Sequence, residues 1–373
     1  MQKAKQVVNN LTLGGLPVAP LGKDGPLVNR LGYGTMGLSA FYGQKKPDPE
    51  RFAVLDKLYN DGERFWDTAD IYQDSEDLLG KSRWLFIPFS PRHEHMLTNP
   101  GNWFKQNPGK RENIFLATKF ANKVDSQGNR CIDTSPEYTK SACAKSLSRL
   151  GVHQIDLYYA HRLDGKTPVE KTVEALAQLK EEGKIKYLGL SECSAESLRR
   201  ACKVHHISAV QIEYSPFSLD IESSQIGLLK ACRELGVAIV AYSPIGRGML
   251  GGELRSHADI PDGDFRKLVP RFSEENFPKN LALVDRITEI AKKKGCTASQ
   301  LTLAWILAQG DDFFPIPGTT NLGRIDENLG SLKVHITKEE EAEIRHACEK
   351  AEVSGGRYPE GMAATLFADT PAL

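Results

Sequence analysis

Short apolar runs alternate with amphipathic segments along most of the chain. The runs have the length and continuity of strands buried on both faces, and they lie at 114–119, 155–160, 187–190, 209–213 and 238–241. Between them, apolar positions recur every three to four residues, as in amphipathic helices covering 49–60, 136–150, 168–182, 195–203 and 226–235. Pro136 and Pro168 stand where a first helical residue is expected. The chain therefore reads as repeated strand–helix units.

Strand–helix units spaced about 30 residues apart imply a parallel sheet. A first candidate strand lies near 28–34 and an eighth at 313–316. Eight units favour a closed (β/α)8 TIM barrel over two Rossmann halves. We predict an α/β fold with a lead at 1–27, one barrel domain at 28–351 and a tail at 352–373. A Gly/Pro-rich, lid-like excursion at 250–278 follows the seventh strand.

Residues 81–101 interrupt this pattern. A helix begins near Ser75 and resumes at Asn102, and joining Gly80 directly to Asn102 gives one continuous helical pattern. The codons for 80–82 are compatible with a GTAAGT splice donor, and those for 97–101 with a branch point and an acceptor. Our hypothesis is a translated, in-frame retained intron. The alternative is a genuine insertion that loops out of the helix.

The segment 32–37 matches G-x-G-x-x-G, with Asp56 about 20 residues later, as in a dinucleotide-binding fingerprint. The context argues against it. Gly43, Pro47 and Pro49 would interrupt any helix opening at Gly37, and Asp56 falls inside a helix rather than at a strand end. We interpret the glycines as allowing backbone to approach a ligand at the barrel mouth.

Composition narrows the class of protein. Lysine plus arginine equals aspartate plus glutamate at 48 each, so net charge gives no argument for nucleic acid or an anionic membrane as partner. Neither a signal-peptide core nor a run near the ~20 apolar residues of a membrane span occurs. Seven scattered cysteines without Cys-x-x-Cys spacing indicate reduced thiols. We predict a cytoplasmic protein, with no metal site.

Four polar residues stand at the ends of candidate strands: Asp67, Tyr72, Lys119 and His161. If these strands are parallel neighbours, the four side chains converge on one mouth of the barrel. A phenol titrates near pH 10 and needs a cation beside it to work nearer neutrality, where Lys119 would lower its pKa by ~1–3 units. Asp67 would hold the ammonium, and His161 would bond a substrate oxygen. Each residue alone could have a purely structural role, such as capping a turn or packing in the core. Together the four predict a proton-donating site for a carbonyl.

At these residues the chain resembles the aldo-keto reductase superfamily from about residue 31 to 351, apart from 81–101. The resemblance is carried by DTADIY (67–72), ATKF (117–120), YAHR (159–162), KIKYLGLSE (184–192), QIEYSP (211–216), YSPIGRG (242–248) and IPGTT (316–320). It implies a (β/α)8 barrel that binds NADP(H) without a Rossmann domain. It also implies Tyr72 as proton donor, supported by Asp67, Lys119 and His161.

The same resemblance implies a set of cofactor contacts. Ser191 and Gln211 would hold the nicotinamide carboxamide, and Tyr242 would stack on the ring. The remaining contacts would fall at Gly34, Thr35, Met36 and Asp67, at Ser243, Pro244, Ile245, Gly246, Arg247 and Gly248 along the pyrophosphate, and at Gly318, Thr319, Thr320, Arg324, Glu327 and Asn328 around the adenosine 2′-phosphate and adenine. A short helix expected across 319–328 would offer its N-terminus to phosphate.

Two positions depart from parts of the superfamily. Glu192 stands where some branches have asparagine, and an ionised carboxylate cannot donate to a carboxamide. Gly318 stands where some branches have lysine, which removes one phosphate contact.

We predict an NADPH-dependent reductase of aldehydes or ketones that is a monomer or a weak homo-oligomer. Its substrate contacts are expected from Phe41, Tyr42, Ile71, Arg162 and the excursion after residue 250. The alternative is a nucleotide-binding regulatory subunit of the same fold, since some members of the superfamily are ion-channel auxiliary subunits.

Overall fold

A closed ring of eight parallel strands organises the molecule. The computed structural model describes residues 11–80, 102–124 and 127–373. In spatial order the strands are β4 (Tyr33–Gly34), β5 (Phe65–Asp67), β6 (Phe115–Phe120), β9 (Ile155–Ala160), β10 (Ile185–Ser191), β11 (Ala209–Glu213), β12 (Ala238–Tyr242) and β13 (Phe313–Pro315). The Gly32 N–H donates to Pro315 O at 3.0 Å, which joins the first strand to the last. The predicted TIM barrel is confirmed.

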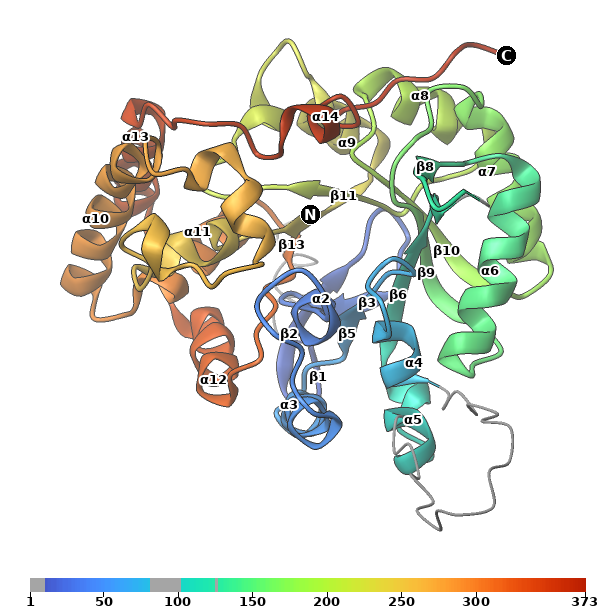
Figure 1. Ribbon diagram of the computed structural model, residues 1–373, viewed down its shortest axis with the longest axis horizontal. Helices are drawn as coiled ribbons and strands as arrows, with labels where there is room; N and C mark the ends of the chain where they lie inside the picture. Colours follow the sequence, from blue (N-terminus) through green and yellow to red (C-terminus); the bar gives the residue numbers. More distant parts are fainter. Residues whose placement is uncertain (1–10, 81–101, 125–126) are drawn as a thin grey trace.

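Helices cover the outside of the barrel (Figure 1). They are α3 (Asp48–Asn60), α4 (Ser75–Leu79), α5 (Trp103–Gln106), α6 (Pro136–Leu150), α7 (Val169–Glu181), α8 (Ala195–Val204), α9 (Leu228–Leu235), α10 (Phe277–Lys294), α11 (Ala298–Ala308), α12 (Leu322–Gly330) and α13 (Lys338–Lys350). Their starts follow local signals: Ser135 and Ser194 cap α6 and α8 by accepting backbone N–H groups, and Pro136 is the first residue of α6. Gly151 ends α6 in a left-handed conformation.

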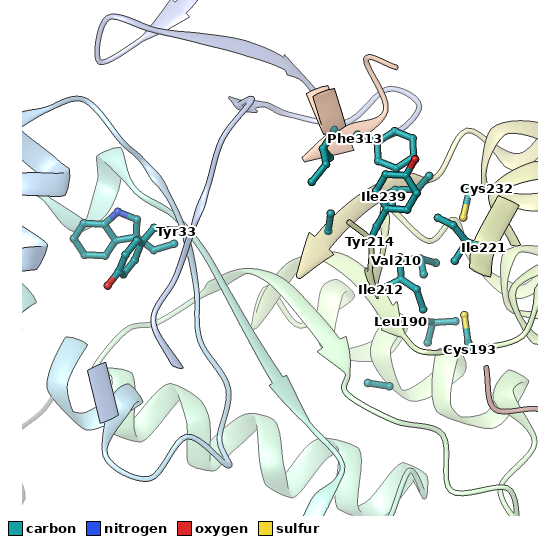
Figure 2. Packing of buried hydrophobic residues seen from close by; sticks show 14 of the residues in the cluster. Tyr33, Leu190, Cys193, Val210, Ile212, Tyr214, Ile221, Cys232, Ile239 and Phe313 are labelled. Atoms are coloured by element: carbon teal, nitrogen blue, oxygen red, sulfur yellow. The ribbon is translucent and has the colours of Figure 1, made fainter. Parts of the chain in front are cut away.

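Alternation along each strand separates two apolar cores. Inward residues such as Phe65, Ala117 and Tyr159 pack inside the barrel. Their neighbours, such as Leu116 and Tyr158, pack outward against the helices. Figure 2 shows part of the outer core: Val210 and Ile212 of β11, Ile239 of β12, and Phe313 of β13 gather with Tyr214, Ile221 and Cys232. This alternation decides which side chains reach the barrel interior.

The barrel interior leaves no space for a side chain on β10 at Gly189. A Cβ there would lie 2.3 Å from the Tyr159 ring, which fills the interior beside it. Glycine is therefore needed for Tyr159 to point inward.

A small antiparallel sheet closes the end of the barrel opposite the strand C-termini. It consists of β1 (Thr12–Leu13), β2 (Leu16–Pro20) and β3 (Leu27–Asn29). Fully buried Leu21 and Val28 pack against Phe65 and other inward residues. The candidate strand near 28–34 is therefore corrected: 27–29 pairs with β2, and only Tyr33 and Gly34 join the barrel. A bend at Arg30 and Leu31 separates the two strands.

One turn of helix, α2 (Met36–Ser39), follows β4 and contains Gly37, where no helix was expected. It is far too short to resemble a dinucleotide-binding helix. As predicted, Asp56 lies inside a helix (α3), where its carboxylate accepts from the Trp103 indole at 2.8 Å. The segment thus has no Rossmann context.

Residues 81–101 lie outside the described part of the chain, so the intron hypothesis stays a prediction. The residues on either side are well packed. Gly80 ends α4 with its Cα against the Leu150 backbone, and Trp103 and Phe104 of α5 are buried. The two short helices α4 and α5 lie where the interrupted helix was expected.

After β6, a hairpin of β7 (Asn122–Val124) and β8 (Arg130–Ile132) extends from the mouth. After β12, the predicted excursion forms a chain of 3-10 turns: η3 (Gly246–Gly251), η4 (His257–Asp259), η5 (Phe265–Leu268) and η6 (Pro270–Phe272). The C-terminal segment with α14 (Glu360–Ala363) crosses the mouth (Figure 1). Within the described ranges, none of the helices has both the length and the apolar character needed to cross a bilayer.

Candidate active site

The alternation of side chains along each strand brings the predicted polar residues together at the C-terminal mouth. Asp67 shares the inward face of β5 with Phe65, and Lys119 shares that of β6 with Ala117. Gln211 and Tyr242 follow inward Ala209 and Val240 on β11 and β12 in the same way. Because every strand is parallel, these inward positions all lie at one end of the barrel.

Lys119 is the centre of the site. Its ammonium donates to Asp67 Oδ1 at 2.5 Å, to the Thr68 carbonyl at 2.7 Å and to the Tyr72 hydroxyl at 3.4 Å. Asp67 and Lys119 are both buried, so the ion pair is shielded from solvent. The other carboxylate oxygen of Asp67 accepts from Gln211 Nε2 at 2.8 Å. The phenol, the amine and the acid thus lie in one hydrogen-bonded group.

Burial dominates the electrostatics of this group. It raises the pKa of Tyr72 well above its ordinary value, and the Asp67 carboxylate raises it further. The expected lowering by Lys119 is therefore not found. Burial also raises the pKa of Asp67 and lowers that of Lys119, and the attraction between the two charges opposes both shifts. Burial and the Asp67 carboxylate therefore outweigh any stabilisation of the Tyr72 phenolate by the Lys119 ammonium.

His161 completes the predicted four. Its ring meets the Tyr72 ring edge-on, with centroids 5.9 Å apart. Burial lowers its pKa well below the ordinary range, and Lys119 and Arg162 lower it further, so the imidazole is neutral near pH 7. The Asn122 side-chain amide lies 3.2 Å from His161 Nδ1. Since an amide NH2 only donates, Nδ1 accepts and the ring proton lies on Nε2.

Apolar and aromatic side chains surround the phenol. Phe41 meets the Tyr72 ring edge-on at 6.3 Å, and Met36 and Ile71 pack in the same cluster. The Tyr42 ring lies under the Arg266 guanidinium, whose carbon is 5.0 Å from the ring centroid. Phe41, Ile71 and Met36 thus lie beside the phenol, as expected for substrate or nicotinamide contacts.

Two predicted cofactor residues turn inward instead of toward open space. The Thr35 hydroxyl is fully buried and bonds Asp67 O and Ser75 Oγ, so it supports the Asp67 backbone. Ser191, at the end of β10, accepts from Arg162 Nη1 at 3.3 Å. Arg162 also donates to the His161 carbonyl, which links the predicted carboxamide position to the phenol side of the site.

The loop after β12 has an unusual backbone. Ser243, Gly246, Arg247 and Gly248 all have positive φ values, from 48° to 95°. Gly246, Arg247 and Gly248 are left-handed in succession, and the Gly246 and Gly248 N–H groups donate to the Ser243 and Ile245 carbonyls, so the loop is a series of tight turns. The pyrophosphate contacts predicted at 243–248, with Pro244 and Ile245 between these residues, stay a prediction. The Arg247 side chain is buried, however, and its Nη2 pairs with Glu213 at 3.1 Å.

The loop after β13 carries the residues predicted to surround the adenosine 2′-phosphate and adenine. A Cβ on Gly318 would lie 2.4 Å from the Gly34 carbonyl, which explains why no lysine stands there. The helix starts at Leu322, later than expected, with Asn321 as its cap. Arg324 projects from the first turn and pairs with Glu253 of the β12 loop. Thr319, Thr320 and Glu327 are partly exposed beside it, and Asn328 is buried beneath.

Sequence reasoning missed several residues of the site. Asn122 orients His161, Glu192 is buried at the mouth, and Arg357 and Tyr358 reach Glu192 and Tyr242 from the C-terminal segment. Glu192 had been noticed only as a departure from asparagine. Nothing local marks Arg357, because its partner lies far away in the sequence. In the part of the chain that the structure describes, no cluster of His, Cys, Asp or Glu could hold a metal ion.

Comparisons with known proteins find relatives that match nearly the whole chain. The profile described as "Aldo/keto reductase family" matches residues 30–349. The chain is 48% identical over 363 residues to aldo-keto reductase str7 of Strobilurus tenacellus, with 96% of this chain and 99% of that protein covered. It is 46% identical over 359 residues to aldo-keto reductase yakc [NADP(+)] of Schizosaccharomyces pombe, with the same two coverages.

Solved structures share the fold at lower identity. The glycerol dehydrogenase AKR11B4 of Gluconobacter oxydans superposes with a TM-score of 0.74 at 23% identity, covering 91% of this chain and 97% of that one. Holo AKR11C1 of Bacillus halodurans gives a TM-score of 0.67 at 24% identity, covering 93% and 97%. On the family match and the two full-length relatives, this chain belongs to the aldo/keto reductase family of oxidoreductases.

Proposed function

We propose that this protein reduces an aldehyde or ketone to the alcohol with NADPH, using Tyr72 as proton donor. The observation that carries the proposal is the buried group in which the Lys119 ammonium contacts both Asp67 and the Tyr72 hydroxyl. A phenol whose pKa is raised by burial stays protonated at neutral pH. It is therefore always ready to donate to an alkoxide, which is a far stronger base.

Each side chain of the site has its own proposed role in the reduction of the carbonyl. Bound NADPH would supply the hydride for the carbonyl carbon. Tyr72 gives its proton to the carbonyl oxygen, and Lys119, 3.4 Å from the phenol oxygen, stabilises the negative charge left there. Asp67 holds the ammonium in place. The Nε2–H of neutral His161 donates to the same carbonyl oxygen and fixes its direction.

The residues present fit NADP(H). The loop at 243–248 would contact the pyrophosphate through groups other than the Gly246 and Gly248 N–H, which already donate within the loop. Arg324 offers an exposed guanidinium to the 2′-phosphate after releasing Glu253. Ser191, Gln211 and Tyr242 stand at the mouth for the nicotinamide. The yakc relative of fission yeast has NADP(+) in its name, which supports the choice of cofactor.

The substrate contacts we propose are Phe41, Tyr42, Ile71 and Arg162, with residues of the loop after β12. Phe41 and Ile71 pack beside the phenol. Balanced charge and free cysteines support a cytoplasmic protein, and we propose a monomer or weak homo-oligomer.

Replacement of the donor tests the proposal. Tyr72→Phe should lower kcat by about 10²–10⁴-fold, the usual contribution of a positioned acid. NADPH binding, followed by quenching of protein fluorescence, should be unchanged because the ring remains. Tyr187→Phe is the matched control, since Tyr187 lies near the opposite end of the barrel, packed against Phe115.

Turnover by Tyr72→Phe at the wild-type rate would refute the role of the phenol. A wild-type protein that binds NADPH but reduces none of a panel of aldehydes and ketones would instead support the nucleotide-binding regulatory subunit.

A further inference from the structure

Five charged side chains form a buried cluster at the mouth of the barrel. Arg357 binds Glu192 through both guanidinium nitrogens, at 3.1 and 3.2 Å. Arg247 binds Glu213 at 3.1 Å, and Arg271 lies 3.6 Å from the same carboxylate. Every one of these side chains is less than a tenth exposed. Buried ion pairs add little net stability compared with apolar packing, so this cluster calls for another explanation.

Arg357 comes from the C-terminal segment, which is docked along the mouth rather than free. Gly355 packs closely on Pro270 of the β12 loop. Farther on, the Ser194 N–H donates to Ala368 O, and Arg200 donates to Thr370 O at 2.8 Å. In Figure 1 the segment runs across the top of the view from α13 to the C-terminus near α8.

Glu192 connects this segment to Tyr242. The same carboxylate oxygen that Arg357 Nη1 binds also accepts from the Tyr242 hydroxyl at 2.6 Å. Tyr358, next to Arg357, places its hydroxyl 3.2 Å from that of Tyr242. Glu192 has a φ of 50°, an unfavourable conformation for a residue with a side chain. Such strain is typical of sites where a side chain must be held in one place.

We propose that Arg357 and Glu192 are positioning residues for the cofactor ring. Arg357 fixes the Glu192 carboxylate, and the carboxylate fixes the Tyr242 ring on which the nicotinamide would stack. The C-terminal segment is thereby an integral part of the nicotinamide site. This inference rests on the proposed function, because it assigns Tyr242 to the nicotinamide.

The test compares two arginines that hold the same segment. Arg357→Gln removes the cation at Glu192. Arg200→Gln removes the contacts to Thr370 and Glu170 but leaves the mouth untouched. We expect Arg357→Gln to raise the Kd for NADPH and lower kcat about tenfold or more, since small displacements in an active site carry such costs. Arg200→Gln should lower the Tm and leave both constants within about twofold of wild type.

Further variants separate positioning from folding. Arg357→Lys keeps the buried charge and should recover part of the affinity. Glu192→Gln should weaken NADPH binding as Arg357→Gln does, and the double variant should be no worse than either single one, because the two residues act as a unit. If Arg357→Gln does not fold, Arg357→Lys and Glu192→Gln provide the same comparison.

Wild-type NADPH affinity and kcat in the folded Arg357 and Glu192 variants would overturn the inference. So would equal weakening by Arg200→Gln, which would show that docking of the segment alone matters. A wild-type protein that neither binds nor oxidises NADPH would instead refute the proposed function.

Discussion

Lys119 has a defined partner for each of its three ammonium protons. It donates to a carboxylate, a backbone carbonyl and a phenol, and its side chain is fully buried. The sequence predicted that Lys119 would lie beside Asp67 and Tyr72, but it predicted neither the bond to the Thr68 carbonyl nor the sign of the pKa shift of Tyr72. Burial depends on the surrounding fold, whereas the motif shows only which residues are present.

The pKa of Tyr72 leads to a prediction at the residue scale. Burial and the Asp67 carboxylate raise it above the ordinary value of 10.0, since both disfavour the phenolate. Tyr72 therefore stays protonated up to pH values at which exposed tyrosines ionise. An ultraviolet difference titration of the cofactor-free protein, wild type against Tyr72→Phe, should show no signal from this residue below about pH 10. A tyrosinate signal between pH 7 and 9 that is missing in Tyr72→Phe would contradict this and restore the original expectation.

At the scale of elements, local sequence patterns predicted the regular strands and helices. They did not predict the boundary between the two sheets near residue 30 or the contacts of the C-terminal segment. The runs at 155–160 and 209–213 coincide with β9 and β11. The run at 28–34 was misassigned because Val28 and Tyr33 are both apolar and buried but belong to different sheets. The contact of Arg357 with Glu192 could not be predicted, because it joins segments far apart and depends on how the chain crosses the mouth.

Residues 81–101 give a prediction for one helix. If they are a retained intron, deleting them joins Gly80 to Asn102 and restores one continuous helix from α4 to α5. The deleted protein should fold with an equal or higher Tm and retain full kcat. The control replaces the same residues with a Gly/Ser linker of equal length, which removes the sequence but keeps the interruption.

Loss of folding or activity in the deletion alone would favour a genuine insertion. Sequencing the transcript is an independent check, and a coding DNA without splice-site codons at 80–82 would exclude the intron.

In the whole molecule, the candidate active site and the sheet that closes the barrel lie at opposite ends. The site lies at the C-terminal mouth, and the β1–β3 sheet covers the other end with Leu21 at 0% exposure. In TIM barrels generally, residues at the C-terminal face serve the reaction and residues at the opposite face serve stability.

Leu21→Ala should therefore lower the free energy of unfolding by about 2–5 kcal/mol, the cost of a core leucine truncation. Leu27→Ala, in the same sheet but 44% exposed, should change it by less than about 0.5 kcal/mol. Urea unfolding measures both. The kcat of each variant at low temperature should equal that of wild type, and a selective loss in Leu21→Ala would show that the two ends are coupled.

The alternation of inward and outward side chains along the strands limits how this enzyme can evolve. Asp67, Lys119 and Gln211 reach the mouth only because each lies an even number of positions from an inward core residue. Loss of one codon in β6 before Lys119 would turn Lys119 toward the helices and bring Phe120 to its place at the mouth. Changes in length are thus tolerated beyond the strand ends but not within them, so new substrate preferences must arise from altered loops around an unchanged ring.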